Sequence, residues 1–212
     1  MRWGWERLAA LAGIVAVALW IIGGAIQESI GGEEQETPAG VLSYYQEDTN
    51  AILASGFIFQ LGALFFLLFL SALRSRLWSL EGGTGMLATL AFASGVAVAI
   101  FLLALPAADM SGAINEDEIG ADAAQALSSL DDVFFIGAEL SASVLLFATG
   151  LLAVRRRALP AWLGWASFVI ALWLLIPPIG WAGLLLGVPL WVLVTSVLLY
   201  LRPLPAPPPG TA

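Results

Sequence analysis

Every basic residue in this chain is an arginine, and the arginines lie only in short segments that alternate with long apolar stretches. They are Arg2, Arg7, Arg74, Arg76, Arg155, Arg156, Arg157 and Arg202. All of the acidic residues except Glu6, Glu81 and Glu139 lie in two polar loops that contain no arginine. Arginine on one side and acidic loops on the other is the positive-inside pattern of a multi-span membrane protein. The pattern predicts a topology, whereas it does not predict an activity.

The composition leads to the same fold class. The 212 residues are 60% apolar and only 11% charged, and the mean hydropathy is +0.92. One water-soluble core cannot bury that much apolar surface, so the lipid bilayer is the expected solvent. The net charge of -8 says little about partners, because acidic and basic residues are segregated. The basic clusters are too small to indicate nucleic-acid binding.

The chain contains no cysteine and no histidine. Without cysteine it forms no disulfide and offers no thiol nucleophile or thiolate metal ligand. Without histidine it offers no histidine ligand for haem or zinc and no histidine general base. We therefore expect no cofactor and no metal site, and these absences argue against zinc intramembrane proteases, cytochrome-b-like electron carriers and catalytic triads.

Six apolar stretches are long enough to be predicted membrane spans. They are residues 8–26, 51–73, 84–107, 133–154, 160–176 and 179–201. A helix rises about 1.5 Å per residue, so about twenty residues cross a hydrocarbon core about 30 Å thick. An even number of spans, with every arginine segment on the same side, places both termini in the cytoplasm of a cell-membrane protein.

The first stretch, residues 8–26, also resembles the apolar part of a signal peptide. That part is normally only about 7 to 15 residues long, so we favour a membrane-spanning helix. Residues 1–202 are then expected to form a single transmembrane domain. Residues 203–212 are rich in proline and are expected to form a disordered cytoplasmic tail.

The two long outer loops are each expected to contain a short amphipathic helix. In the first loop, Thr37 is placed to cap a helix that has Pro38 at its first position. In the second loop, Asn115 and the acidic residues 116–118 form a start similar to a capping box, and apolar residues recur at helical spacing over 119–130. The predicted fold is thus an all-α membrane protein, a bundle of six transmembrane helices with amphipathic helices in the outer loops.

Several turn and boundary motifs occur in a fixed order along the chain. They are Tyr44-Tyr45, Leu70 with Leu73-Arg74, Glu81-Gly82-Gly83, and Leu159-Pro160 with Trp162-Leu163-Gly164-Trp165. This order resembles an uncharacterised family of six-span membrane proteins that is common in high-GC actinobacteria. The resemblance covers roughly residues 40–175. It implies a six-helix fold in the plasma membrane, and it brings no known activity or catalytic residues.

Small residues and aromatic residues are interpreted structurally. Ala91, Gly95 and Ala99 have the four-residue spacing that permits close helix contact, as do Gly183 and Gly187. The aromatic residues at the ends of the apolar stretches are interpreted as belts at the two membrane interfaces. Tyr44 and Tyr45 belong to the outer belt. Pro189 removes one helical hydrogen bond and is expected to bend the last span.

Glu139 is the one acidic residue inside an apolar stretch, about 10 Å along the helix from Asp132. A charge near the centre of a membrane helix costs about 2.5 to 3.5 kcal/mol, so Glu139 is expected to face the interior of the bundle. Gln60 enters its stretch from the same side and reaches a depth of about 15 Å beyond Asn50. We therefore expect the second and fourth spans to be neighbours, with Gln60 close to Glu139.

Two functional interpretations follow. Glu139 is a proton- or cation-responsive group of a solute pathway, with Gln60, Ser141 and Ser143 as polar contributors, or it is a structural carboxyl that orients helices. The sequence favours a non-catalytic structural or partner-binding membrane protein, and a small transporter that uses Glu139 is the alternative. In both interpretations the lipid bilayer surrounds the protein, and a membrane-protein partner or a small solute is the expected ligand. A lipid-modifying enzyme has the least support, because no nucleophile is defined.

Overall fold

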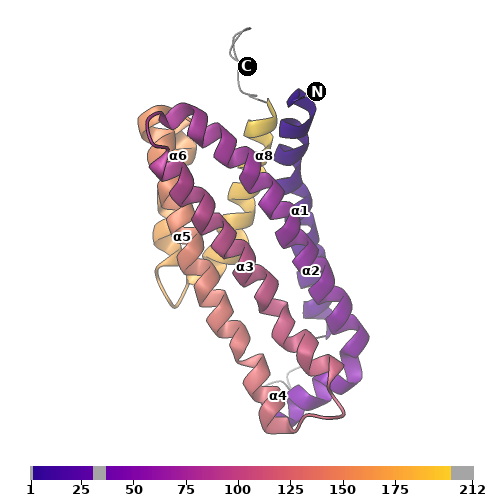
Figure 1. The fold of residues 1–212 in the computed structure, drawn as a ribbon. Helices are drawn as coiled ribbons and strands as arrows, with labels where there is room; N and C mark the ends of the chain where they lie inside the picture. Colours follow the sequence, from indigo (N-terminus) through magenta and orange to yellow (C-terminus); the bar gives the residue numbers. More distant parts are fainter. Residues whose placement is uncertain (1, 31–36, 202–212) are drawn as a thin grey trace.

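The computed structural model describes residues 2–30 and 37–201, and this part of the chain is helical without any strand (Figure 1). The elements are α1 (Arg2–Ile30), α2 (Pro38–Glu81), α3 (Met86–Ile114), α4 (Ala121–Ser128), α5 (Leu130–Arg156), α6 (Ala161–Leu174), α7 (Gly180–Ala182), the π-helical segment η2 (Gly183–Gly187) and α8 (Val188–Leu201). The predicted all-α fold is confirmed. The proline-rich tail lies outside the described residues.

The long helices pack side by side in a chain of neighbours. α1 packs along α2, α2 along α3, α3 along α5, and α5 along α6, while α8 packs against α1 (Figure 1). α3 therefore lies between α2 and α5. The beginning of α1 and the end of α8 lie at the same end of the bundle, and α4 lies at the opposite end (Figure 1).

Five helices are long and apolar enough to cross a membrane, and they include five of the six predicted stretches. They are residues Arg7–Ile30, Pro38–Glu81, Met86–Ile114, Ala121–Arg156 and Gly180–Leu201. The stretch predicted at 160–176 forms α6, which has 14 residues. It is thus about 21 Å long, which is less than the thickness of a hydrocarbon core.

The helix predicted in the first outer loop forms, but it continues into the second apolar stretch. The Thr37 hydroxyl accepts a hydrogen bond from the backbone N–H of Gly40 at 3.1 Å, as expected for a cap. The helix then runs for 44 residues, with one non-helical position at Asp48, where φ is -115° and ψ is 17°. Asp48 therefore divides α2 into an outer segment and the long apolar segment.

The start predicted for the second outer helix is wrong. Asn115 ends α3, and its side-chain amide donates to the carbonyl of Ser111 at 2.8 Å. α4 begins later, after Gly120. α3 extends beyond its predicted end at residue 107 because its last turns are buried in tertiary contacts. A Cβ on Gly112 would lie 2.2 Å from the Tyr45 ring, and Ala113 is buried.

The tight connection between α2 and α3 forms as the glycines predict. Gly82, Gly83 and Gly85 all have positive φ, a conformation that costs glycine little because it has no Cβ. The Glu81 carboxylate accepts hydrogen bonds from the backbone N–H groups of Leu87 and Ala88 at 2.9 and 2.7 Å. The acidic side chain thus caps α3 at the positive end of its dipole.

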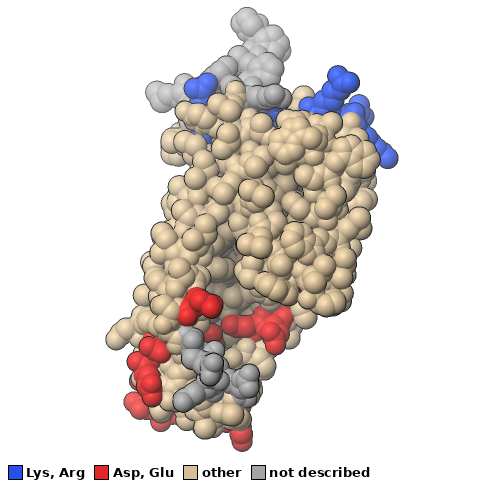
Figure 2. Space-filling view, turned by 180° about the vertical axis from the view of Figure 1, so that it is seen from behind, with Lys and Arg blue, Asp and Glu red and all other residues tan. Residues whose placement is uncertain are grey.

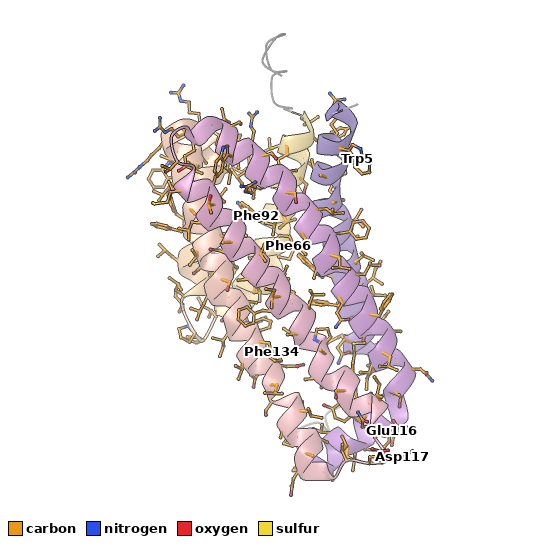
Figure 3. All side chains as sticks on the ribbon, viewed as in Figure 1. Trp5, Phe66, Phe92, Glu116, Asp117 and Phe134 are labelled. Carbon is orange, nitrogen blue, oxygen red and sulfur yellow. The ribbon has the colours of Figure 1, made fainter. Side chains whose placement is uncertain are left out.

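Charged side chains gather at the two ends of the bundle. Figure 2 shows arginines at one end and acidic side chains towards the other, with other residues covering the surface between them. Figure 3 places Trp5 at the first end and Glu116 and Asp117 at the second. The segregation seen along the sequence is therefore also a segregation in space.

The small residues pack as predicted. A Cβ on Gly95 would lie 2.6 Å from Leu70, so α3 approaches α2 closely at this point. Gly183 and Gly187 face Leu174 and Ile170 of α6 in the same manner, at 3.2 and 3.0 Å. Both glycines bound the π-helical segment η2, which ends two residues before Pro189. A π-helical turn widens the hydrogen-bond ladder where a proline lacks its N–H, which explains this irregularity.

We predict that Gly164→Ala destabilises the contact between α5 and α6. The added Cβ would lie 2.8 Å from Val154, 2.9 Å from Ala153 and 3.1 Å from the backbone oxygen of Gly150. Overpacking of this kind costs about 1 to 3 kcal/mol, which exceeds the gain of about 1 kcal/mol from replacing a helical glycine. Thermal unfolding of the purified protein in detergent measures the effect. Gly24→Ala is the matched control, because its Cβ would meet nothing within 4 Å, and equal unfolding temperatures for the two variants would contradict the prediction.

Candidate functional site

The polar residues singled out in the sequence do not form one site. Glu139 is buried, with 7% of its surface exposed, and its Oε1 atom lies 2.8 Å from the position that a Cβ would take on Gly180. Gln60 instead donates a hydrogen bond to the carbonyl of Leu103 in α3, at 2.9 Å. The expected proximity of Gln60 and Glu139 stays a prediction, and the hydrogen bond of Gln60 is made to α3, which packs along both α2 and α5.

The two serines also make local contacts. Ser143 is buried and donates to the carbonyl of Leu140 at 2.7 Å, within its own helix. Ser141 is partly exposed. Neither serine forms a hydrogen bond with Gln60 or Glu139, and Glu139 has no side-chain hydrogen bond within residues 2–30 and 37–201. Glu139 therefore fits best as a buried group packed against Gly180, the first residue of α7.

A different polar cluster lies at the end of the bundle that carries the acidic residues. Asp109, near the end of α3, and Asp131, in the first turn of α5, lie within hydrogen-bond reach of each other. The hydroxyl of Tyr45 in α2 donates to Oδ1 of Asp109 at 2.7 Å. Oδ1 of Asp131 is buried and has no hydrogen-bond partner among the described residues. Two carboxyls that face each other in this way need a proton between them.

A second set of hydrogen bonds connects α1 to the same cluster. The amide of Gln27 donates to the hydroxyl of Tyr44, and the Gln27 Oε1 atom accepts from the hydroxyl of Ser55 at 3.0 Å. Ser55 also lies 3.0 Å from the carbonyl of Ile52, in its own helix. Polar groups from α1, α2, α3 and α5 thus converge at one level of the bundle.

These groups line an outer pocket, which has a volume of about 110 Å³. Its lining includes Gln27, Ser55, Phe59, Pro106, Asp109 and Asp131. Gly56 permits the close approach of α3 to α2 here, because a Cβ on it would lie 2.6 Å from Met110. The pocket presents hydrogen-bond acceptors and two carboxyls, so it suits a small cation or a hydrogen-bond donor.

The carboxyl pair lies beyond the long apolar part of its helices. The rise of an α-helix places Asp109 about 35 Å from Met86 and Asp131 about 36 Å from Arg155. Both distances exceed the thickness of a hydrocarbon core, about 30 Å. The pair therefore lies outside the predicted spans 84–107 and 133–154, at the outer boundary of the bundle.

Burial and mutual repulsion set the protonation of the pair. Burial raises the pKa of Asp109, while hydrogen bonds from Tyr45 and Asp131 oppose that rise. Burial, followed by the charge of Asp109, raises the pKa of Asp131 to about 8. The charge of Asp132 raises the pKa of Asp131 further. Because the outer loops contain no basic residue to compensate, the pair keeps one proton near neutral pH.

The neighbouring tyrosines respond to the same charges. Burial raises the pKa values of Tyr44 and Tyr45, and the carboxylate of Asp109 raises both further. Asp48 contributes to the rise in the pKa of Tyr44. Both tyrosines therefore remain neutral hydrogen-bonding groups, and Tyr45 serves the cluster as a donor.

The sequence did not indicate this cluster. The sequence interpretation assigned Tyr44 and Tyr45 to an aromatic belt. Instead, Tyr44 and Tyr45 are buried, with 8% and 0% of their surfaces exposed. They form a small outer core with Val41, Ile52, Ala113 and Ala124. The available signal was the helical spacing of Val41, Tyr44 and Tyr45, which places them on one face.

Within the described residues, no group of three or more acidic side chains is placed to hold a metal ion. Comparison of the chain with protein-family models, with curated proteins and with solved structures finds no match. The class that the structure defines is therefore an all-α bundle with five helices of membrane-spanning length and apolarity. The resemblance to an actinobacterial six-span family stays a prediction.

We predict that raising the pH destabilises the protein through Asp131. The pKa of this carboxyl rises from 3.8 to about 8 on folding, so between these values the folded state binds more protons than the unfolded state. The free energy of unfolding therefore falls as the pH rises through this window, by at most about 1.4 kcal/mol per pH unit for one proton. Asp131→Asn should remove this component, and thermal unfolding in detergent between about pH 5 and about pH 9 measures it.

The matched control is Asp122→Asn, which neutralises an exposed carboxyl of α4. This variant should keep the pH dependence of the wild-type protein. If the wild type and Asp131→Asn lose stability equally over the same pH range, then Asp131 does not hold the proton.

Proposed function

We propose that this chain is an integral protein of the cell membrane with both termini in the cytoplasm and α4 on the outer side. The five long apolar helices support membrane insertion. The gathering of arginines at the end where α1 begins and α8 ends supports the orientation (Figure 2). In this arrangement α6, which has 14 residues, completes the bundle as a short sixth membrane segment.

Cysteine labelling tests the topology, because the chain has no native cysteine. Ser79, near the end of α2, and Asp122, in α4, are both exposed and lie at opposite ends of the bundle. We expect an impermeant thiol reagent to label Asp122→Cys in intact cells and to label Ser79→Cys only after the cells are permeabilised. The reverse pattern would show that the orientation is inverted.

We propose that the protein binds a ligand at the outer pocket and that the proton on the Asp109 and Asp131 pair controls this binding. The observation that carries the proposal is the pair itself, two partly buried carboxyls that line one pocket whose lining includes no basic residue. A partly buried carboxyl pair can exchange its proton for a cation at little cost, because the proton and the cation each compensate the same negative charge. Binding and proton release are then coupled.

A non-catalytic role fits the remaining groups of the pocket. The Ser55 hydroxyl lies against the Gln27 carbonyl oxygen and the backbone of its own helix, and no general base is placed to activate it. Tyr44 and Tyr45 are neutral and hydrogen-bonded. This arrangement favours the binding role predicted from the sequence over a lipid-modifying enzyme.

The transporter that uses Glu139 has weaker support. The residues that line the outer pocket do not include Glu139, whose carboxyl instead lies against Gly180 at the start of α7. We therefore propose a structural role for Glu139 and assign the proton-responsive role to Asp109 and Asp131.

Infrared spectroscopy of the protein reconstituted in lipid tests the proton. We expect a protonated carboxyl band near neutral pH that disappears as the pH rises through about 8. The band should be lost in Asp131→Asn and kept in Glu139→Gln. A band that persists in Asp131→Asn and disappears in Glu139→Gln would return the proton-responsive role to Glu139 and contradict the proposal.

A further inference from the structure

An apolar cavity lies next to the outer pocket. It has a volume of about 280 Å³, and its lining includes Val17, Trp20, Phe59, Leu102, Leu184 and Leu185. These side chains come from α1, α2, α3 and η2, so the cavity lies between the first half of the bundle and its last helical segments. Its walls are almost entirely apolar, whereas the lining of the outer pocket includes the carboxyls of Asp109 and Asp131.

The outer pocket and the apolar cavity adjoin. Gly24, Phe59 and Leu105 line both of them. Gly24 is exposed, and a Cβ added to it would meet no atom within 4 Å, so α1 is uncovered at this position. Figure 2 shows this side of the bundle hollowed between two columns of side chains, with acidic side chains at the foot of the hollow.

The two ends of the combined site differ in polarity. At one end, Asp109 and Asp131 supply negative charge, and Gln27 supplies a carbonyl oxygen. At the other end, the walls offer only apolar contact apart from Trp20, which is nine-tenths buried and has an indole N–H without a partner among the described residues. A molecule that satisfies both ends has a cationic head and an apolar tail.

We propose that the outer pocket and the apolar cavity together bind a single-chain amphiphile with a primary ammonium head, the head against the carboxyls of Asp109 and Asp131 and the alkyl chain beside Phe59 and Trp20. This inference rests on the proposed ligand-binding function and names the class of ligand. The open side at Gly24 lets the chain enter from the surrounding lipid.

The donor count of the head favours a primary ammonium. An ammonium group has three N–H donors, and the site offers acceptors on Asp109, Asp131 and Gln27. The cation takes the place of the shared proton, so binding releases that proton to the solvent.

The experiment is native mass spectrometry of the full-length protein in a nonionic detergent, with dodecylamine as the probe and dodecanol as its uncharged counterpart. We expect one bound dodecylamine per chain and at least about tenfold weaker binding of dodecanol, since a charge-assisted hydrogen bond contributes about 1.5 to 3 kcal/mol. Binding should strengthen from about pH 6 to about pH 9, because the pair loses its proton while an alkylamine with a pKa near 10.4 stays charged.

Two variants and one control locate the site. The double variant with Asp109→Asn and Asp131→Asn should weaken dodecylamine binding by about tenfold or more and should leave dodecanol binding unchanged. Gly24→Phe should weaken binding of both probes, since it adds a ring at a position that lines both the pocket and the cavity and whose Cβ meets no other residue. Ile22→Phe places the same ring on an exposed face of α1 and should bind both probes like the wild type.

Equal binding of dodecylamine and dodecanol would overturn the proposal, and so would wild-type binding in Gly24→Phe. These two results decide the question even if the double variant does not fold. The infrared titration separates the two levels of inference. If the pair titrates but dodecylamine has no preference over dodecanol, the class of ligand is wrong and the proposed function stands. If the pair does not titrate and dodecylamine binding does not depend on pH, both are wrong.

Discussion

The close packing of α3 between α2 and α5 is the constraint on which the rest of the structure depends. Gly95 lies against Leu70, and Gly137 of α5 lies against Phe101, so both neighbours approach the α3 backbone closely. Near the outer end, Gly56 lies against Met110 and Gly112 against Tyr45. Helices without a strong polar face associate through such contacts, because small residues increase the packing area. The position of Asp109 follows from this packing.

The absence of a basic residue from the outer loops favours a shared proton on the carboxyl pair. A buried carboxylate next to an arginine would be ionised at all physiological pH values and would serve as a structural contact. Asp109 and Asp131 have no such partner in their loops, and their mutual repulsion favours one shared proton. The same charge segregation that supports a membrane orientation therefore also makes this site responsive to protons.

The outer pocket and the apolar cavity form the proposed ligand site next to this carboxyl pair. The pocket is small and acidic, and the cavity is larger and apolar, with Gly24, Phe59 and Leu105 common to both. The irregular segment η2 and Pro189 contribute to the cavity wall, and they lie where the helical hydrogen-bond ladder is interrupted. Proton binding at one end and apolar contact at the other would couple the occupancy of the site to pH.

Local features were readable from the sequence because each depends on only a few neighbouring residues. The glycine turn after Glu81, the Thr37 cap, the positions of the long apolar helices and the segregation of charge all belong to this group. The extent of α3 did not, because its last turns are held by tertiary burial of Gly112 and Ala113 rather than by local preference.

Which helix faces meet was decided only by the tertiary structure. Glu139 could be recognised as unusual, but its neighbour at Gly180 and the bond from Gln60 to Leu103 could not be derived from depth alone. The same holds for Asp109 and Asp131, which lie on different helices at the edges of apolar stretches. A helix that is apolar on all sides has little periodicity to mark its buried face, so the sequence determined that these helices form but not which of their faces meet. The contacts of small side chains then determined which carboxyls came together.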